Sequence, residues 1–295
     1  MLALLTGLWA GLARLGWDVP LPRPGFSSLH GPLMVSGFLG TLIGLERAVA
    51  LGRPWAYAAP LLTGLGGVSL IVGAPLLVAQ WLMLAGSLVL VAIFAAIIRR
   101  HPALYTFTMG GGSLVWALGN LLWCLGWPVF LVVFWWAAFL VVTIAGERLE
   151  LARLQQVTGA AQATFLLLLG VLLTGLLLLG WSYDGGIRLF GLGLAGLALW
   201  LGRHDIARRT VKQAGLTRFI AICLLTGYVW LGISGLSAMW FGGVPVGPQY
   251  DATLHAFFLG FVFAMIFAHA PIIFPAVLGA RMAYRPLFYA HVALL

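Results

Sequence analysis

Charged residues are scarce in this 295-residue chain. Lys, Arg, Asp and Glu make up only 8% of it, whereas 62% of the residues are hydrophobic. The mean hydropathy of +1.07 excludes an ordinary soluble domain. Connections between the apolar runs are short, and none is long and polar enough to form a soluble domain. The composition therefore predicts a multi-pass membrane protein.

Cysteine is scarce as well. The two cysteines, Cys124 and Cys223, lie in different apolar runs, and the sequence contains no CxxC or CxxCH. This excludes a disulfide framework and a covalently attached c-type haem. The simplest interpretation of both cysteines is a small apolar side chain.

Acidic residues are few, and the cations are unevenly placed. The formal net charge is +9, from 16 Lys and Arg against 7 Asp and Glu. Because the cations occupy alternate loops, the positive-inside rule assigns those loops and the amino terminus to the cytoplasm. The charge thus indicates topology and contact with anionic lipid, and not a nucleic-acid partner. The cations of these loops are Arg47, Arg53, Arg99, Arg100, Arg148, Arg153, Arg203, Arg208, Arg209, Lys212, Arg218, Arg281 and Arg285.

Apolar runs recur along the whole chain, each long enough to cross about 30 Å of hydrocarbon as a helix. We expect residues 1–17 to be a retained helix, since no signal-peptide cleavage site follows them. The segment that begins near 285 is roughly half a crossing long at 1.5 Å per residue, so we expect the carboxyl end to be incomplete. The ten complete runs lie near 1–17, 28–46, 55–73, 76–98, 103–125, 128–146, 160–181, 186–202, 218–241 and 250–272.

An internal repeat relates the second and tenth runs. Residues 29–60 and 254–286 both open with Leu-His, carry Gly-Phe about seven residues later, and end with Leu-Gly, Arg and Ala-Tyr before Pro. The sixth run ends in "TIAGERLELARL", which is similar to "TLIGLERAVAL" at the end of the second. The related runs, numbers two, six and ten, thus recur at every fourth run along the chain. We therefore predict an all-α transmembrane bundle, with about eleven helices seen and twelve when complete, in a pseudo-threefold arrangement. The domain is a single one, 1–295, built of four-helix units near 1–98, 103–202 and 218–295.

The repeat places His30 and His255 at matching positions, each at the outer end of its helix. Both lie 16 residues before an inner-end residue, Glu46 or Pro271, roughly 24 Å along a helix. One interpretation is a pair of interfacial histidines that cap helix starts or bond to a neighbouring helix. The other is axial ligation of a haem iron, which takes two imidazoles held by second hydrogen bonds.

Four further histidines are interpreted separately. His269 and His291 form a second candidate haem site at the inner depth, and packing of His269 against Pro271 is the competing interpretation. His101 and His204 follow arginines in inner loops, so we expect them to be solvated.

The chain resembles the catalytic subunits of haem–copper oxygen and nitric oxide reductases, and more closely the NnrS-type membrane proteins related to them. The resemblance implies twelve helices in three arcs of four, with a low-spin haem on helices two and ten, the positions of His30 and His255. The sixth run, "FWWAAFLVVTIAGERL", contains no histidine, and Thr253 stands where the reductases carry a second histidine on helix ten. A copper site is therefore not expected, and whether the protein is an enzyme stays open.

The histidine pair and this resemblance together lead us to expect a haem b protein of a bacterial-type inner membrane, and the resemblance implies a link to nitric oxide or respiratory stress. Its partners would be the lipid bilayer and an electron-transfer partner. Two alternatives stay open. The first is a transporter or channel in which "HAPIIFP" is a proline-broken helix near the substrate path, although helices two and ten run in the same direction and inverted repeats would not. The second is a structural subunit of a membrane complex.

Overall fold

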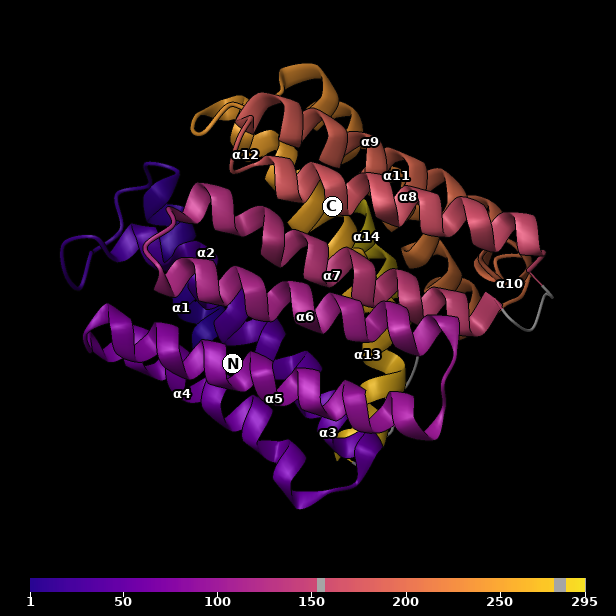
Figure 1. The fold of residues 1–295 in the computed structure, drawn as a ribbon, viewed down its shortest axis with the longest axis horizontal. Helices are drawn as coiled ribbons and strands as arrows, with labels where there is room; N and C mark the ends of the chain where they lie inside the picture. Colours follow the sequence, from indigo (N-terminus) through magenta and orange to yellow (C-terminus); the bar gives the residue numbers. More distant parts are fainter. Residues whose placement is uncertain (153–156, 279–284, 295) are drawn as a thin grey trace. The chain divides into compact units, whose positions relative to one another are not determined.

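The computed structural model describes residues 1–152, 157–278 and 285–294 (Figure 1). Within these residues the regular structure is helical, and the described part contains no strand. This confirms the predicted all-α class. A helix lies at each of the ten complete apolar runs, with boundaries that differ from the predicted ones by a few residues.

Eight helical segments of the described chain are long and apolar enough to cross a membrane. The helix α1 (Leu2–Arg14) has 13 residues and is shorter than a crossing. The helix α6 (Leu104–Cys124) has the length of a crossing, but Thr, Ser, Gly and Asn make it less apolar than the eight. The eight segments are Phe26–Leu51, Pro54–Val72, Leu76–Arg100, Val129–Ala152, Gly159–Leu178, Tyr183–His204, Gly215–Phe241 and Pro248–Ile273.

The chain divides into two compact units, Met1–Phe139 and Leu140–Leu295, so that α7 (Val129–Ala152) contributes to both. The predicted four-helix units and their pseudo-threefold arrangement stay predictions. The remaining elements of the first unit are η1 (Phe26–Leu29), α2 (His30–Pro32), η2 (Leu33–Gly40), α3 (Thr41–Leu51), η3 (Pro54–Tyr57), α4 (Ala58–Val72) and α5 (Leu76–Arg100). Those of the second are α8 (Gly159–Leu178), α9 (Tyr183–His204), α10 (Ala207–Thr210), α11 (Gly215–Phe241), α12 (Pro248–His255), η5 (Ala256–Val262), α13 (Phe263–Leu278), η6 (Pro286–Phe288) and α14 (Tyr289–Leu294).

A buried hydrogen-bond network holds the first unit together around Asn120 of α6. Its Oδ1 atom accepts the indole N–H of Trp136 at 3.0 Å and the hydroxyl of Ser36 at 3.3 Å, and its amide donates to the carbonyl of Met83 at 3.3 Å. Ser36 in turn accepts the indole N–H of Trp116 at 3.2 Å. Since buried polar groups need partners in an apolar medium, this network fixes how η2, α5, α6 and the first part of α7 pack.

Small residues let the helices of the second unit approach closely. A Cβ added at Gly175 of α8 would lie 2.3 Å from the backbone nitrogen of Phe190 on α9. One added at Gly235 of α11 would lie 2.5 Å from the backbone nitrogen of Ala195 on α9. These contacts bring backbone against backbone, as is typical of helix packing in membranes.

Candidate functional site

His30 stands at the start of α2 in the first unit. Its Nδ1 atom lies 2.8 Å from the carbonyl oxygen of Gly7 on α1. A Cβ added at Gly11, one turn further along α1, would lie only 2.8 Å from the same Nδ1 atom. The two glycines therefore allow α1 to lie against the imidazole and to hold its orientation.

His255 ends α12 in the second unit. Its Nδ1 atom lies 2.7 Å from the carbonyl oxygen of Asp251, one turn earlier in the same helix. The contact is made by the main-chain carbonyl of Asp251 and not by its carboxylate.

The backbone has the same unusual form after both histidines. His30 is followed by the π-helical segment η2 (Leu33–Gly40), and His255 by the π-helical segment η5 (Ala256–Val262). The two enclosing segments, Phe26–Leu51 and Pro248–Ile273, have 26 residues each. π-Helical turns are rare and are found frequently at functional sites. The structure thus repeats, in backbone form, the relation between runs two and ten that the sequence predicted.

Both imidazoles also make the same kind of hydrogen bond, from Nδ1 to a main-chain carbonyl. A main-chain carbonyl only accepts hydrogen bonds, so the Nδ1–H group of each ring is the donor in these two contacts. Histidines that ligate metals have this arrangement, with the second nitrogen bonded to a carbonyl, a carboxylate or water. The donor chemistry of His30 and His255 therefore fits an axial ligand of haem iron.

The glycines beside the two histidines serve helix packing. A Cβ added at Gly37 of η2 would lie 3.4 Å from the Cα atom of Gly67 on α4, and one at Gly260 of η5 would lie 2.4 Å from Trp230 on α11. Ser36 is buried in the Asn120 network. Neighbouring helices therefore take up the room beside Ser36, Gly37 and Gly260, and these small residues leave no space there for a macrocycle.

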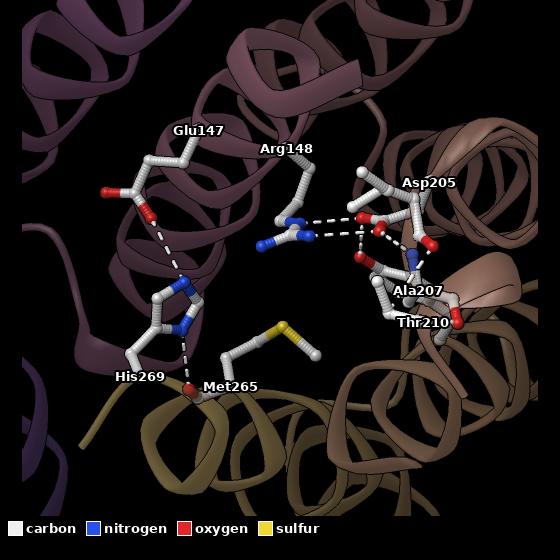
Figure 2. Close-up of polar contacts among 9 residues, drawn as sticks. Glu147, Arg148, Asp205, Ala207, Thr210, Met265 and His269 are labelled. Carbon is white, nitrogen blue, oxygen red and sulfur yellow. Dashed lines mark hydrogen bonds and ion pairs between the residues drawn. The ribbon is translucent and has the colours of Figure 1, made fainter. Parts of the chain in front are cut away.

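His269 of α13 lies beside Glu147 of α7 in the second unit (Figure 2). Its Nδ1 atom is 2.6 Å from the carbonyl oxygen of Met265, and its Nε2 atom is 3.9 Å from Oε2 of Glu147. Glu147 therefore lies where an iron and its macrocycle would have to approach Nε2. The side chain of His291, the other residue of this second candidate site, falls outside the described part of the structure, so the pair stays a prediction.

A buried ionic network lies next to that pair (Figure 2). Arg148 of α7 donates to both carboxylate oxygens of Asp205, at 2.6 Å from Nε and 2.9 Å from Nη2. The hydroxyl of Tyr228 on α11 donates to Oδ2 of Asp205 at 2.5 Å, and the backbone N–H of Ala207 donates to Oδ1 at 2.7 Å. Arg148, Asp205 and Tyr228 are all buried. The charges of the pair are thus neutralised and hydrogen-bonded where water has little access.

Sequence reasoning missed Asp205 and Tyr228. The structure pairs Glu46 with Arg47 beside it, at 3.1 Å, but it pairs Arg148 with Asp205, 57 residues away. The available signal was that Asp205 is the only acid in the basic stretch 203–218. His204, expected to be solvated, stacks on Trp200 with ring centroids 4.7 Å apart, and His101 is exposed as expected.

Among the described residues, no three or more His, Cys, Asp or Glu side chains gather as they would around a metal ion. A haem ligated by two histidines requires no such cluster. His30 and His255 belong to different units, and their pairing at one iron stays a prediction.

Helices of this length and composition, joined by short connections, define a multi-pass helical membrane protein. The chain belongs to the family described as domain of unknown function DUF8744, whose model matches residues 1–295. No curated protein and no solved structure matches it.

Proposed function

We propose that this protein binds haem b in a membrane, with His30 and His255 as the axial ligands. The observation that carries the proposal is the matched setting of the two imidazoles. Each has Nδ1 bonded to a main-chain carbonyl, and a π-helical segment begins within three residues after each in a repeated sequence. A purely local helix cap would not require the same backbone form in both repeats.

Bound haem would supply reversible one-electron transfer, which fits a bis-histidine site. Within this proposal His30 and His255 hold the iron, and the carbonyls of Gly7 and Asp251 hold the rings. We further propose a bacterial-type inner membrane, a cytoplasmic amino terminus, a link to nitric oxide or respiratory stress, and an electron-transfer partner. The alternating cations support the orientation, and the resemblance to NnrS-type proteins supports the physiological link.

The test is an absorption spectrum of the detergent-purified full chain after expression with added haem. Wild type should show a Soret band and a haem b pyridine haemochrome, and His30→Ala and His255→Ala should each lose or strongly shift them. His101→Ala, at an exposed histidine, is the matched control. A wild-type protein without a Soret band, or variants with an unchanged band, would overturn the proposal.

Gly11→Ala is a more specific variant, because it removes neither imidazole side chain. Its new methyl group would lie 2.8 Å from Nδ1 of His30 and must displace the ring. We expect a shifted Soret band and a shifted midpoint potential without complete loss of haem. Gly170→Ala, whose methyl group meets no atom within 4 Å, should leave both unchanged.

A second candidate function, an ion-coupled transporter or channel, is favoured by the contact of Glu147 with His269. Both residues lie in segments apolar enough to span a membrane, where ionisable side chains are costly and usually functional. Pro271 and Pro275 interrupt the hydrogen bonding of the same helix, α13. Proteoliposomes loaded with a pH-sensitive dye would then show a proton flux that Glu147→Gln abolishes. The haem proposal alone predicts no such flux.

A further inference from the structure

The connection between α9 and α11 gathers five cations on the protein surface. Both helices are long and apolar enough to cross a membrane, and α9 ends at His204 while α11 begins at Gly215. A connection this short must lie at the bilayer surface, whichever side it faces. We define residues 203–218 as the basic connection. Its cations, all exposed, are Arg203, Arg208, Arg209, Lys212 and Arg218.

The single acid of the basic connection, Asp205, does not reduce the positive charge at the surface. Its carboxylate is buried and bonded to Arg148 of α7. The fold thus turns the one negative charge of the basic connection inward, where Arg148 neutralises it. The exposed face is therefore purely cationic.

The carboxylate of Asp205 also anchors the backbone next to two of the cations. Asp205 accepts the backbone N–H of Ala207, the first residue of α10, and Arg208 and Arg209 follow directly in that short helix. Arg208 also donates to the carbonyl of Arg203 at 3.2 Å. The backbone that carries Arg208 and Arg209 is thus anchored to the buried network.

We propose that the basic connection binds the headgroups of anionic phospholipids. Cations next to a membrane surface attract anionic headgroups by about 1 kcal/mol each, or about fivefold in affinity per residue. The location between two membrane-crossing helices favours a lipid over a soluble polyanion. This proposal does not depend on haem binding.

The test is native mass spectrometry of the delipidated full chain titrated with phosphatidylglycerol or phosphatidylcholine. Wild type should retain phosphatidylglycerol preferentially, and the triple variant Arg208→Gln, Arg209→Gln, Lys212→Gln should weaken that preference by at least about tenfold. Raising NaCl to 1 M, where the Debye length is about 3 Å, should weaken it in wild type too.

The matched control removes three exposed cations from the first unit, with Arg53→Gln, Arg99→Gln and Arg100→Gln. These come from two separate connections and should have a clearly smaller effect. An equal loss in this control, or no loss in the triple variant, would overturn the proposal. So would binding of glycerol phosphate or of a short RNA oligonucleotide as tightly as of phosphatidylglycerol, because it would show a soluble ligand.

Discussion

Replacing Asp205 with Asn should severely destabilise the protein. The substitution keeps the size of the side chain but leaves Arg148 as a buried cation without its bidentate carboxylate, at contacts that are now 2.6 and 2.9 Å. It also weakens the acceptor of the Tyr228 hydroxyl. Breaking a buried pair by removing one partner costs about 3–5 kcal/mol, which lowers the apparent melting temperature by on the order of 10 °C.

The assay is thermal unfolding of the detergent-purified chain, followed by intrinsic tryptophan fluorescence. Arg148→Met combined with Asp205→Asn removes both charges and should recover most of the loss, because replacing a whole pair is far less costly than breaking it. Asp184→Asn provides the control. Asp184 pairs with Arg188 one turn away, but both side chains are largely exposed, so water replaces the lost contact and the effect should be much smaller. If the double variant melts no higher than Asp205→Asn alone, the cost does not come from an uncompensated charge and the reasoning is refuted.

Three further destabilising changes and one control are followed by the same unfolding assay. Tyr228→Phe removes one hydrogen bond to a charged acceptor and should cost about 1.5–3 kcal/mol, less than Asp205→Asn; an equal cost would contradict this order. Asn120→Leu leaves the indole N–H of Trp136 without its acceptor and should cost about 1–3 kcal/mol for each buried group left unbonded, whereas a neutral result would mean that the network adds nothing. Gly40→Ala places a methyl group 2.3 Å from the ring of Trp116, which is buried and stacked on Phe139, and should cost about 1–3 kcal/mol. Gly170→Ala, in the middle of α8 and without neighbours, should be neutral or stabilising, since Ala is the better helix former.

Hydropathy predicted the helices well because the constraint is local. A segment that crosses hydrocarbon must bond its backbone internally and must be apolar over a known length. The runs near 76–98 and 218–241 therefore correspond to α5 and α11 within a few residues. The repeat likewise indicated where His30 and His255 would stand in their helices, since its register depends on the order of residues alone.

The polar contacts could not be predicted in the same way, because they depend on the packing of helices far apart in the sequence. Nothing near Arg148 in the sequence indicates Asp205 as its partner, and nothing near Ser36 indicates Asn120. The π-helical form of η2 and η5 was also missed. Their sequences are apolar and glycine-containing like many membrane helices, so the wider turn leaves no signature in composition.

The π-helical segments link this fold to the proposed function. A π-helical turn shifts the residues that follow it around the helix axis, so a histidine before the turn and a glycine within it can each face a suitable neighbour. In η2, Gly37 meets α4 while His30 is held by α1, and in η5, Gly260 meets α11 while His255 is held within α12. Packing alone explains the two glycine contacts, but it does not explain why each π-helical segment begins within three residues of a histidine whose Nδ1 is bonded to a carbonyl. The same Nδ1 contact occurs at His204 and His269. The π-helical segments are therefore what distinguishes His30 and His255, and this is why the haem proposal commits to them ahead of His269.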